Sequence, residues 1–283
     1  MTDNNQTWDI EIKPQRHLLD LRLGELFAYR DLLEMFIRRD IVTVYKQTVL
    51  GPIWYFTQPL LMMFMFIIVF SNIANIPTDD VPPAIFYLAG IIIWNYFSDC
   101  LLQTSDVFFQ NNAIFEKVYF PRVLVPIARI ISTFIKFIIQ SLLFVAVYFY
   151  LLVNDANIVI NQWILLLPFY LLIMAFMGLG MGLAVSAMTA KYRDLKFLVS
   201  FGVQFMMYLS PVIYPVSTLS ETYVKLMFWN PLSHVLEGFR FSILGAGQLN
   251  LYGLLYALVI SITMVFTGLL LFNKTEQDYV DTI

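Results

Sequence analysis

The sequence of 283 residues is poor in charged side chains and contains a single cysteine. Asp, Glu, Lys and Arg make up 13% of it, about half the share of a typical soluble domain. Cys100 by itself excludes an internal disulfide and any zinc-type ligand spacing. The polar start, MTDNNQTWDIEIKPQ, lacks the early apolar run of a signal peptide, so we expect no cleavable one.

Motifs that carry catalysis are also missing. The sequence has no GxxxxGK[ST] loop to hold the phosphates of ATP, no paired-histidine motif and no GxSxG turn. Asp99 and Asp106, near the end of an apolar segment, leave membrane-embedded acid–base chemistry as an alternative, but no base is paired with them. We expect no catalytic residue, no metal and no cofactor on this chain.

Apolar and aromatic residues are abundant instead. Hydrophobic residues form 59% of the chain, including 26 Phe, 16 Tyr and 5 Trp, and the mean hydropathy is +0.73. A soluble core of this size does not bury so many aromatic rings, whereas lipid solvates them. The sequence therefore predicts an integral membrane protein.

Six apolar stretches are candidate spans for a hydrocarbon core about 30 Å thick. Their apolar runs are continuous rather than alternating, which predicts an all-α protein and not a barrel. The predicted spans are residues 53–73, 84–103, 123–153, 163–189, 197–213 and 249–272, the last of them expected to be peripheral. Together they form a membrane domain, 51–273, between a cytoplasmic segment, 1–50, and a cytoplasmic tail, 274–283.

Lysine and arginine are concentrated on one side of these spans. Residues 1–50, the loops 104–122 and 190–196, and Lys274 hold thirteen of them, against two in the segments on the other side, Lys225 and Arg240. Because cytoplasmic loops are rich in these cations, both termini are predicted to be cytoplasmic.

Arg129 and Lys136 fall inside the predicted span 123–153. At about 46 Å this helix is longer than the bilayer core, so its first turns are expected to project into the cytoplasm. Both cations would then snorkel to the interface. The alternative is an ion relay or a substrate contact within the membrane.

Residues 18–48 have an amphipathic pattern. The apolar positions are Leu26, Leu33, Phe36, Ile37, Ile41 and Val44, and the polar side carries Arg30, Asp31, Glu34 and Arg38. This pattern predicts a helix lying at the cytoplasmic interface, with a soluble helical hairpin as the alternative. Gly51-Pro52 would then turn the chain into the membrane, with Trp54 and Tyr55 at the interface.

In the predicted span 163–189, small residues recur every four positions. Gly178, Gly182 and Ser186 lie in the stretch GLGMGLAVS. A stripe of this kind lets two helices approach closely. It is not a dinucleotide-binding fingerprint, since no strand precedes it.

The loop 110–122, QNNAIFEKVYFPR, is longer than a turn requires. Asn112 is a predicted N-cap for a short helix, 113–119. One side of this helix is apolar and carries Phe115, Val118 and Tyr119. Such a patch is expected to dock on a partner, or alternatively to pack on the 18–48 helix.

The external segment 217–247 has the pattern of two short helices broken at Asn230-Pro231. Neither is long enough to span, which predicts a re-entrant hairpin dipping into the outer leaflet. Glu237 and Arg240, three residues apart, are placed to form an ion pair. His234 is expected to belong to this cap rather than to a metal or catalytic site.

Four stretches resemble, in the same order, the ABC-2-type permeases that export polysaccharides, the O-antigen and teichoic-acid exporters. They are RRDIVTVYKQTVLGPIWYFTQPLLMMFMFIIVF (38–70), NAIFEKVYFPRVLVPIARI (112–130), YRDLKFLVSFGVQFMMYLSPVIYP (192–215) and NPLSHVLEGFRFSIL (230–244). The resemblance extends over nearly the whole chain from residue 20.

The resemblance implies a half-transporter in the plasma (inner) membrane of a bacterium. Two copies would form the channel, and a separate ABC ATPase subunit would use ATP and Mg. The 113–119 helix would be the coupling helix, contacting the ATPase through Phe115, Glu116, Lys117 and Tyr119. The 217–247 hairpin would be the external gate, built around Asn230, Pro231, Glu237 and Arg240. Membrane lipid is an expected partner and nucleic acid is not.

The implied substrate is a lipid-linked polysaccharide of the O-antigen, capsule or teichoic acid type. Aromatic side chains suit such a substrate, because the C–H faces of sugars stack on rings. The candidates are Tyr55 in the first span and Phe201, Phe205 and Tyr208 in the fifth, with packing or lipid contact as the alternative. For the whole chain, the alternatives are an ABC-2 permease for a drug or lipid and a non-transport membrane scaffold or enzyme subunit.

Overall fold

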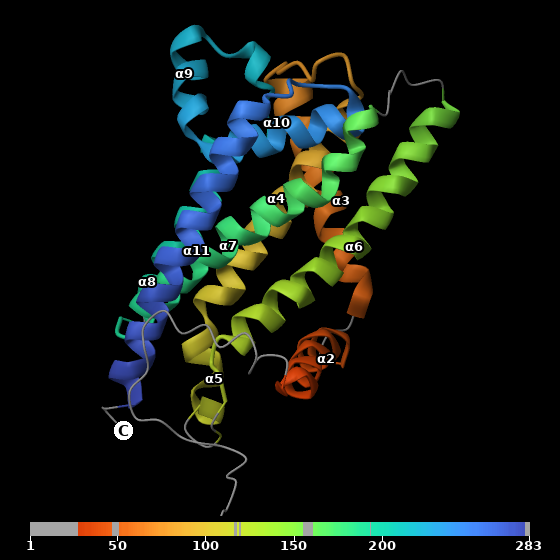
Figure 1. Cartoon of the computed structure of the whole chain (residues 1–283). Coiled ribbons are helices and arrows are strands. Elements are labelled where there is room, and N and C mark those ends of the chain that lie inside the picture. The colour runs from red at the N-terminus through yellow and green to blue at the C-terminus, as the bar shows by residue number, and fades with distance from the viewer. Residues whose placement is uncertain are drawn as a thin grey trace, which may run out of the picture.

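The computed structural model describes residues 28–46, 51–115, 118, 120–154, 161–192 and 194–280. Within these ranges every regular element is a helix, which confirms the all-α prediction (Figure 1). Five helices are long and apolar enough to cross a membrane. They are α3 (Trp54–Phe66) continued by the π-helix η2 (Ile67–Ile73), α4 (Pro83–Ser105), α6 (Leu124–Val153), α7 (Leu167–Thr189) preceded by the 3-10 turn η3 (Gln162–Leu166), and α11 (Leu251–Val280).

The predicted span 197–213 is a shorter helix in the structure. Helix α8 (Leu195–Leu209) has 15 residues and is roughly 22 Å long, less than the thickness of a bilayer core. It ends at Ser210, whose backbone is extended, because the residue before a proline disfavours the helical conformation. The structure thus has five helices of spanning length in its described part, and a sixth span remains a prediction.

Helix α4 is the centre of the bundle, and most of its residues are buried. The small-residue stripe of α7 lies against it, as predicted. A Cβ atom on Gly178 would lie 2.5 Å from Cβ of Cys100, and one on Gly182 would lie 2.6 Å from Cβ of Thr104. Only glycine permits this approach of the two helices.

A second glycine contact joins α7 to α11. A Cβ atom on Gly180 would lie 2.5 Å from the backbone nitrogen of Val265 and 2.6 Å from the carbonyl oxygen of Met264. Farther along α11, the ring of Phe272 is fully buried and stacks on Phe108 with the centroids 4.6 Å apart. The expectation that the last span is peripheral holds for most of its length, since 22% of its most apolar window is buried. One face of it nevertheless packs closely on α7 through Gly180.

The amphipathic helix is α2 (Arg30–Lys46), which packs on α6. Phe36 is buried, whereas Arg30, Asp31, Glu34 and Arg38 are exposed, as the sequence pattern predicts. Leu26 and the side chain of Val44 lie outside the described part. Gly51 has a positive φ of 51° in the 3-10 turn η1 (Gly51–Ile53), directly before α3. The turn directly before the first span is thus confirmed, and its position at the membrane surface stays a prediction.

The short helix of the 110–122 loop is placed differently from the prediction. Helix α5 runs from Val107 to Phe115, so Asn112 lies inside it and is not an N-cap. Phe115 is only 7% exposed and contacts the rings of Phe108 and Phe120. Burial of Val107 and Phe108 at the start of α5 outweighs the local capping signal.

The same contacts correct the interpretation of Phe115 as part of an exposed patch. Phe115 belongs to a buried cluster with Phe36 of α2, which is the alternative considered for this segment. Val118 is 54% exposed. Glu116, Lys117 and Tyr119 lie outside the described residues.

The two ends of the bundle carry different elements. Figure 1 shows α2 and α5 at one end and the short helices α9 (Glu221–Trp229) and α10 (Pro231–Leu244) at the other. The first end carries the predicted cytoplasmic loops, and the second carries the segment predicted to be external. Two groups of polar contacts, one at each end, are the candidate sites.

Candidate functional site

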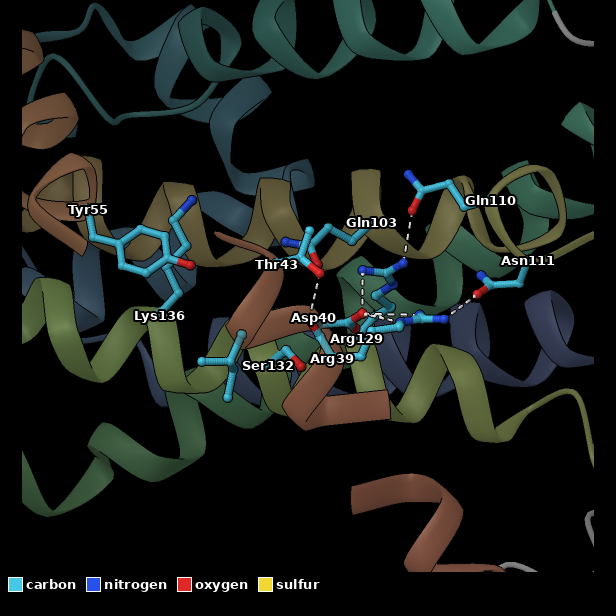
Figure 2. Close-up of a pocket in the computed structure, with 11 residues that line it drawn as sticks. Arg39, Asp40, Thr43, Tyr55, Gln103, Gln110, Asn111, Arg129, Ser132 and Lys136 are labelled. Atoms are coloured by element: carbon cyan, nitrogen blue, oxygen red, sulfur yellow. Dashed lines mark hydrogen bonds and ion pairs between the residues drawn. The ribbon is translucent and has the colours of Figure 1, made fainter. Parts of the chain in front are cut away.

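A polar cavity of about 460 Å³ lies where α2, α3, α4, α5 and α6 meet (Figure 2). Its lining contains three cations, Arg39, Arg129 and Lys136, and one carboxylate, Asp40. Amide and hydroxyl side chains and the ring of Tyr55 complete it. Polar side chains in a bundle rich in apolar residues require hydrogen-bond or ion-pair partners, so this cavity is a candidate site for polar contacts.

Asp40 holds the centre of the cavity. Its Oδ1 atom accepts hydrogen bonds from Nε and Nη2 of Arg39 at 3.2 and 3.1 Å, and lies 3.1 Å from Nη1 of Arg129. Arg39 also donates to Asn111 Oδ1 at 3.1 Å, and Arg129 donates to Gln110 Oε1 at 2.8 Å. These bonds connect the amphipathic helix α2 to α5 and α6.

Lys136 is paired at the other end of the cavity. Its Nζ lies 2.6 Å from Asp99 Oδ2 and 5.6 Å from the centroid of the Tyr55 ring. Arg129 and Lys136 therefore each form an ion pair with a carboxylate, and their position at the membrane interface stays a prediction. Pairing is required here because an uncompensated charge inside a protein is costly.

The two aspartates near the end of α4 also have partners, contrary to expectation. Asp99 pairs with Lys136, and Asp106 Oδ2 lies 2.7 Å from Lys196 Nζ. Both contacts are ion pairs between distant parts of the chain, so the structure gives them a role in holding helices together. Among the described residues, no group of three His, Cys, Asp or Glu side chains is placed to hold a metal.

The predicted aromatic path divides into two parts. Tyr55 lines the cavity, whereas Phe201, Phe205 and Tyr208 do not. These three share the outward face of α8, where they are 72%, 55% and 46% exposed. The prediction that they lie on one face is confirmed, and the structure leaves that face uncovered within the chain.

At the other end of the bundle, Asn230 and Pro231 separate α9 from α10, as predicted. The Asn230 side chain accepts a hydrogen bond from the Leu232 amide at 3.1 Å and caps α10, whose first residue is Pro231. Its Nδ2 donates to Ser210 Oγ at 3.1 Å. The break between the two helices is thereby attached to the end of α8.

Arg240 is the most deeply buried cation of this cap. It donates to the carbonyl oxygens of Pro211, at 2.6 Å, and Val212, and its guanidinium lies 4.0 Å from the centroid of the Phe86 ring. Glu237 Oε1 is 3.9 Å away, so the predicted pair forms, although loosely. Burial lowers the pKa of Arg240 to about 10 and raises that of Glu237. Arg240 thus stays charged at neutral pH and clamps the end of α8.

His234 belongs to the same cap, as expected. Its Nε2 lies 2.9 Å from the carbonyl oxygen of Phe228, and its ring contacts Phe228 and Tyr256 edge-on. These contacts assign it to packing. The bonds from Asn230 and Arg240 to the segment after α8 were not predicted, because their partners there are a serine hydroxyl and two backbone carbonyls, which have no sequence pattern.

Comparison with known proteins gives consistent matches over most of the chain. The family model described as "ABC-2 type transporter" matches residues 32–244. An O-antigen export system permease protein of Klebsiella pneumoniae is 23% identical, with 92% of this chain and 97% of the relative covered. A permease protein of the same description from Myxococcus xanthus is 21% identical over 92% and 98%. The polysialic acid transport protein of Escherichia coli is 23% identical over 87% and 93%.

Proposed function

Because the chain belongs to the ABC-2 type transporter family, we propose that it is the permease subunit of an ATP-driven exporter of a lipid-linked polysaccharide. The observation that carries the proposal is the end-to-end similarity to proteins named for O-antigen export and polysialic acid transport. Five helices of spanning length agree with it. ATP hydrolysis is then the task of a separate subunit, since the sequence has no P-loop.

The channel forms between two copies of this chain. The support is the aromatic face of α8 that Phe201, Phe205 and Tyr208 form, which no other described part of the chain covers. An exposed aromatic face in a membrane protein contacts either lipid or the surface of another subunit or ligand. In the dimer we place it along the path of the glycan, where rings stack on sugars.

The ATPase subunit contacts the segment that follows α5. This segment lies at the cation-rich end, and Val118 is exposed there. Glu116, Lys117 and Tyr119 remain its candidate contact residues. Phe115, which packs on Phe108 and Phe120, is buried and is not proposed as a contact residue.

Helices α9 and α10 form the external gate. Asn230 and Arg240 both bind the end of α8, so a shift of this cap also moves the aromatic face of α8. A re-entrant position of the pair in the outer leaflet is supported by the length of each helix, 9 and 14 residues, which is too short to span.

The proposed orientation places both termini in the cytoplasm, in the plasma (inner) membrane of a bacterium. Asp80→Cys and Lys225→Cys are then expected to react with a membrane-impermeant maleimide in intact cells. Lys191→Cys is expected to react only after permeabilisation. All three positions are exposed, and the native Cys100 is buried and gives a low background. Labelling of Lys191→Cys in intact cells would contradict this orientation and indicate the opposite one.

Deletion of the gene in its source organism is expected to remove a polysaccharide from the cell surface and to accumulate lipid-linked glycan inside. The wild-type gene restores export, and Phe205→Leu with Tyr208→Leu restores it about two- to tenfold less well, because leucine has no flat face for a sugar. Surface polysaccharide is measured by immunoblot, together with the amount of permease in the membrane.

The matched control is Phe149→Leu with Tyr150→Leu, an aromatic pair of equal type that is 60% and 69% exposed on α6. It is expected to export normally. Unchanged surface polysaccharide in the deletion strain would indicate another substrate, such as a drug or lipid. Equal export by the two double variants would assign the α8 face to packing.

A further inference from the structure

The polar cavity beneath α2 carries more positive than negative charge. Arg39, Arg129 and Lys136 line it together with Asp40. When Asp99, the partner of Lys136, is included, the cations outnumber the carboxylates by three to two. A cavity inside a protein favours a ligand that balances such an excess, because a partly buried charge without a counter-charge is unfavourable.

Lys136 has hydrogen-bonding capacity that is not used within the described part of the chain. The Lys136 ammonium has three donors, of which one is directed at Asp99. Oδ1 of Asp40 contacts both Arg39 and Arg129. The main effect of Asp40 is therefore to position these two guanidinium groups, and its repulsion of a bound anion is the smaller effect.

The cavity lies beside exposed apolar side chains at the start of α3. Figure 2 shows Tyr55 and Lys136 together at one end of it. Ile53 and Trp54, directly before Tyr55 at the start of α3, are 59% and 47% exposed. A molecule with a polar head and an apolar tail can therefore place its head among the cations and its tail along the start of α3.

We propose that this cavity binds the phosphate group of a lipid at the cytoplasmic membrane surface. Lysine and arginine form short, charge-assisted hydrogen bonds to phosphate oxygens, and about 460 Å³ is enough for a headgroup. Two lipids carry this chemistry: an anionic phospholipid of the bilayer, and the phosphorylated end of a lipid-linked glycan. The second source rests on the proposed function, and the first does not.

The test uses the full-length permease, purified in detergent and freed of lipid. It is titrated with phosphatidylglycerol, with undecaprenyl phosphate and with a diacylglycerol of the same acyl chains, and bound lipid is counted by native mass spectrometry. At least one phosphate-bearing lipid is expected to bind about tenfold more tightly than diacylglycerol. Tighter binding of undecaprenyl phosphate identifies the glycan carrier, and tighter binding of phosphatidylglycerol identifies the bilayer lipid.

Variants assign the binding to the cavity. Asp99→Asn with Lys136→Gln removes both charges of one ion pair and leaves no uncompensated charge, and it is expected to weaken phosphate-lipid binding about tenfold or more. Lys136→Arg is expected to keep it. Arg39→Gln, at a partly exposed cation of the same lining, is a second variant expected to weaken it. The matched control, Arg30→Gln with Asp31→Asn, removes an exposed ion pair of α2 whose residues do not line the cavity.

Equal binding of diacylglycerol, or wild-type binding by both cavity variants, would overturn the proposal. Such a result leaves the proposed function standing if deletion of the gene still abolishes surface polysaccharide. Conversely, binding of phosphatidylglycerol that depends on Lys136 supports the site even where no polysaccharide is exported.

Discussion

Replacement of Gly180 by leucine is expected to prevent recovery of a folded permease. The new Cβ atom would lie 2.5 Å from the Val265 nitrogen and 2.6 Å from the Met264 oxygen, which are backbone atoms of α11 and cannot rotate away. The two helices must separate, at a cost above about 3 kcal/mol. This is a large fraction of a typical stability of about 5–15 kcal/mol. The measurement is the yield of monodisperse protein in fluorescence-detected gel filtration.

Gly202→Leu is the matched control for this experiment. Gly202 also lies in an apolar helix, α8, but no atom lies within 4 Å of a Cβ atom built on it. Leucine there is expected to fold as well as the wild type or better, since it is a stronger helix former than glycine by about 0.5–1 kcal/mol. Similar yields of the two variants would contradict the packing of α7 on α11.

Loss of Arg240 is expected to have the second largest effect. Arg240→Leu leaves the carbonyl oxygens of Pro211 and Val212 without their donor and Glu237 without its cation. Breaking a buried charged contact of this kind costs about 3–5 kcal/mol. Thermal unfolding in detergent is expected to begin roughly 6 °C or more below the wild type. The end of α8 is the region expected to loosen first.

Two further variants make the result specific. Arg240→Lys keeps the charge, but one ammonium does not reproduce two guanidinium hydrogen bonds and a stacked plane, so it is expected to be destabilised as well. Lys225→Leu removes an exposed cation from α9 of the same cap and is expected to melt within 1–2 °C of the wild type, roughly the effect of a surface substitution. If Arg240→Lys unfolds at the same temperature as the wild type, the positive charge is sufficient and the two guanidinium hydrogen bonds are not required.

Much of the fold could be predicted because its signals are local. A long apolar run predicts a spanning helix wherever it packs, and the breaks at Gly51-Pro52 and Asn230-Pro231 follow from backbone chemistry. The stripe of Gly178, Gly182 and Ser186 also lies within one helix, and its close approach to α4 is confirmed. In each case the neighbours along the chain carry the information.

The candidate site could not be predicted to the same extent. Lys136 and Asp99 are 37 residues apart, and Arg129 and Asp40 are farther apart still. Read alone, each is an isolated charge near a membrane boundary. Only the packing of α6 against α4 and α2 converts them into ion pairs around one cavity.

The sequence by itself determined the membrane environment, the approximate spans and the amphipathic interface helix, since these follow from hydropathy and periodicity. The tertiary structure alone decided that Phe115 is buried, that one face of α11 packs on Gly180 of α7, and that Arg240 holds the segment after α8. The physical reason is the same for all three. Burial and hydrogen bonding depend on which distant groups fill the space around a side chain, and that space exists only after the helices have packed.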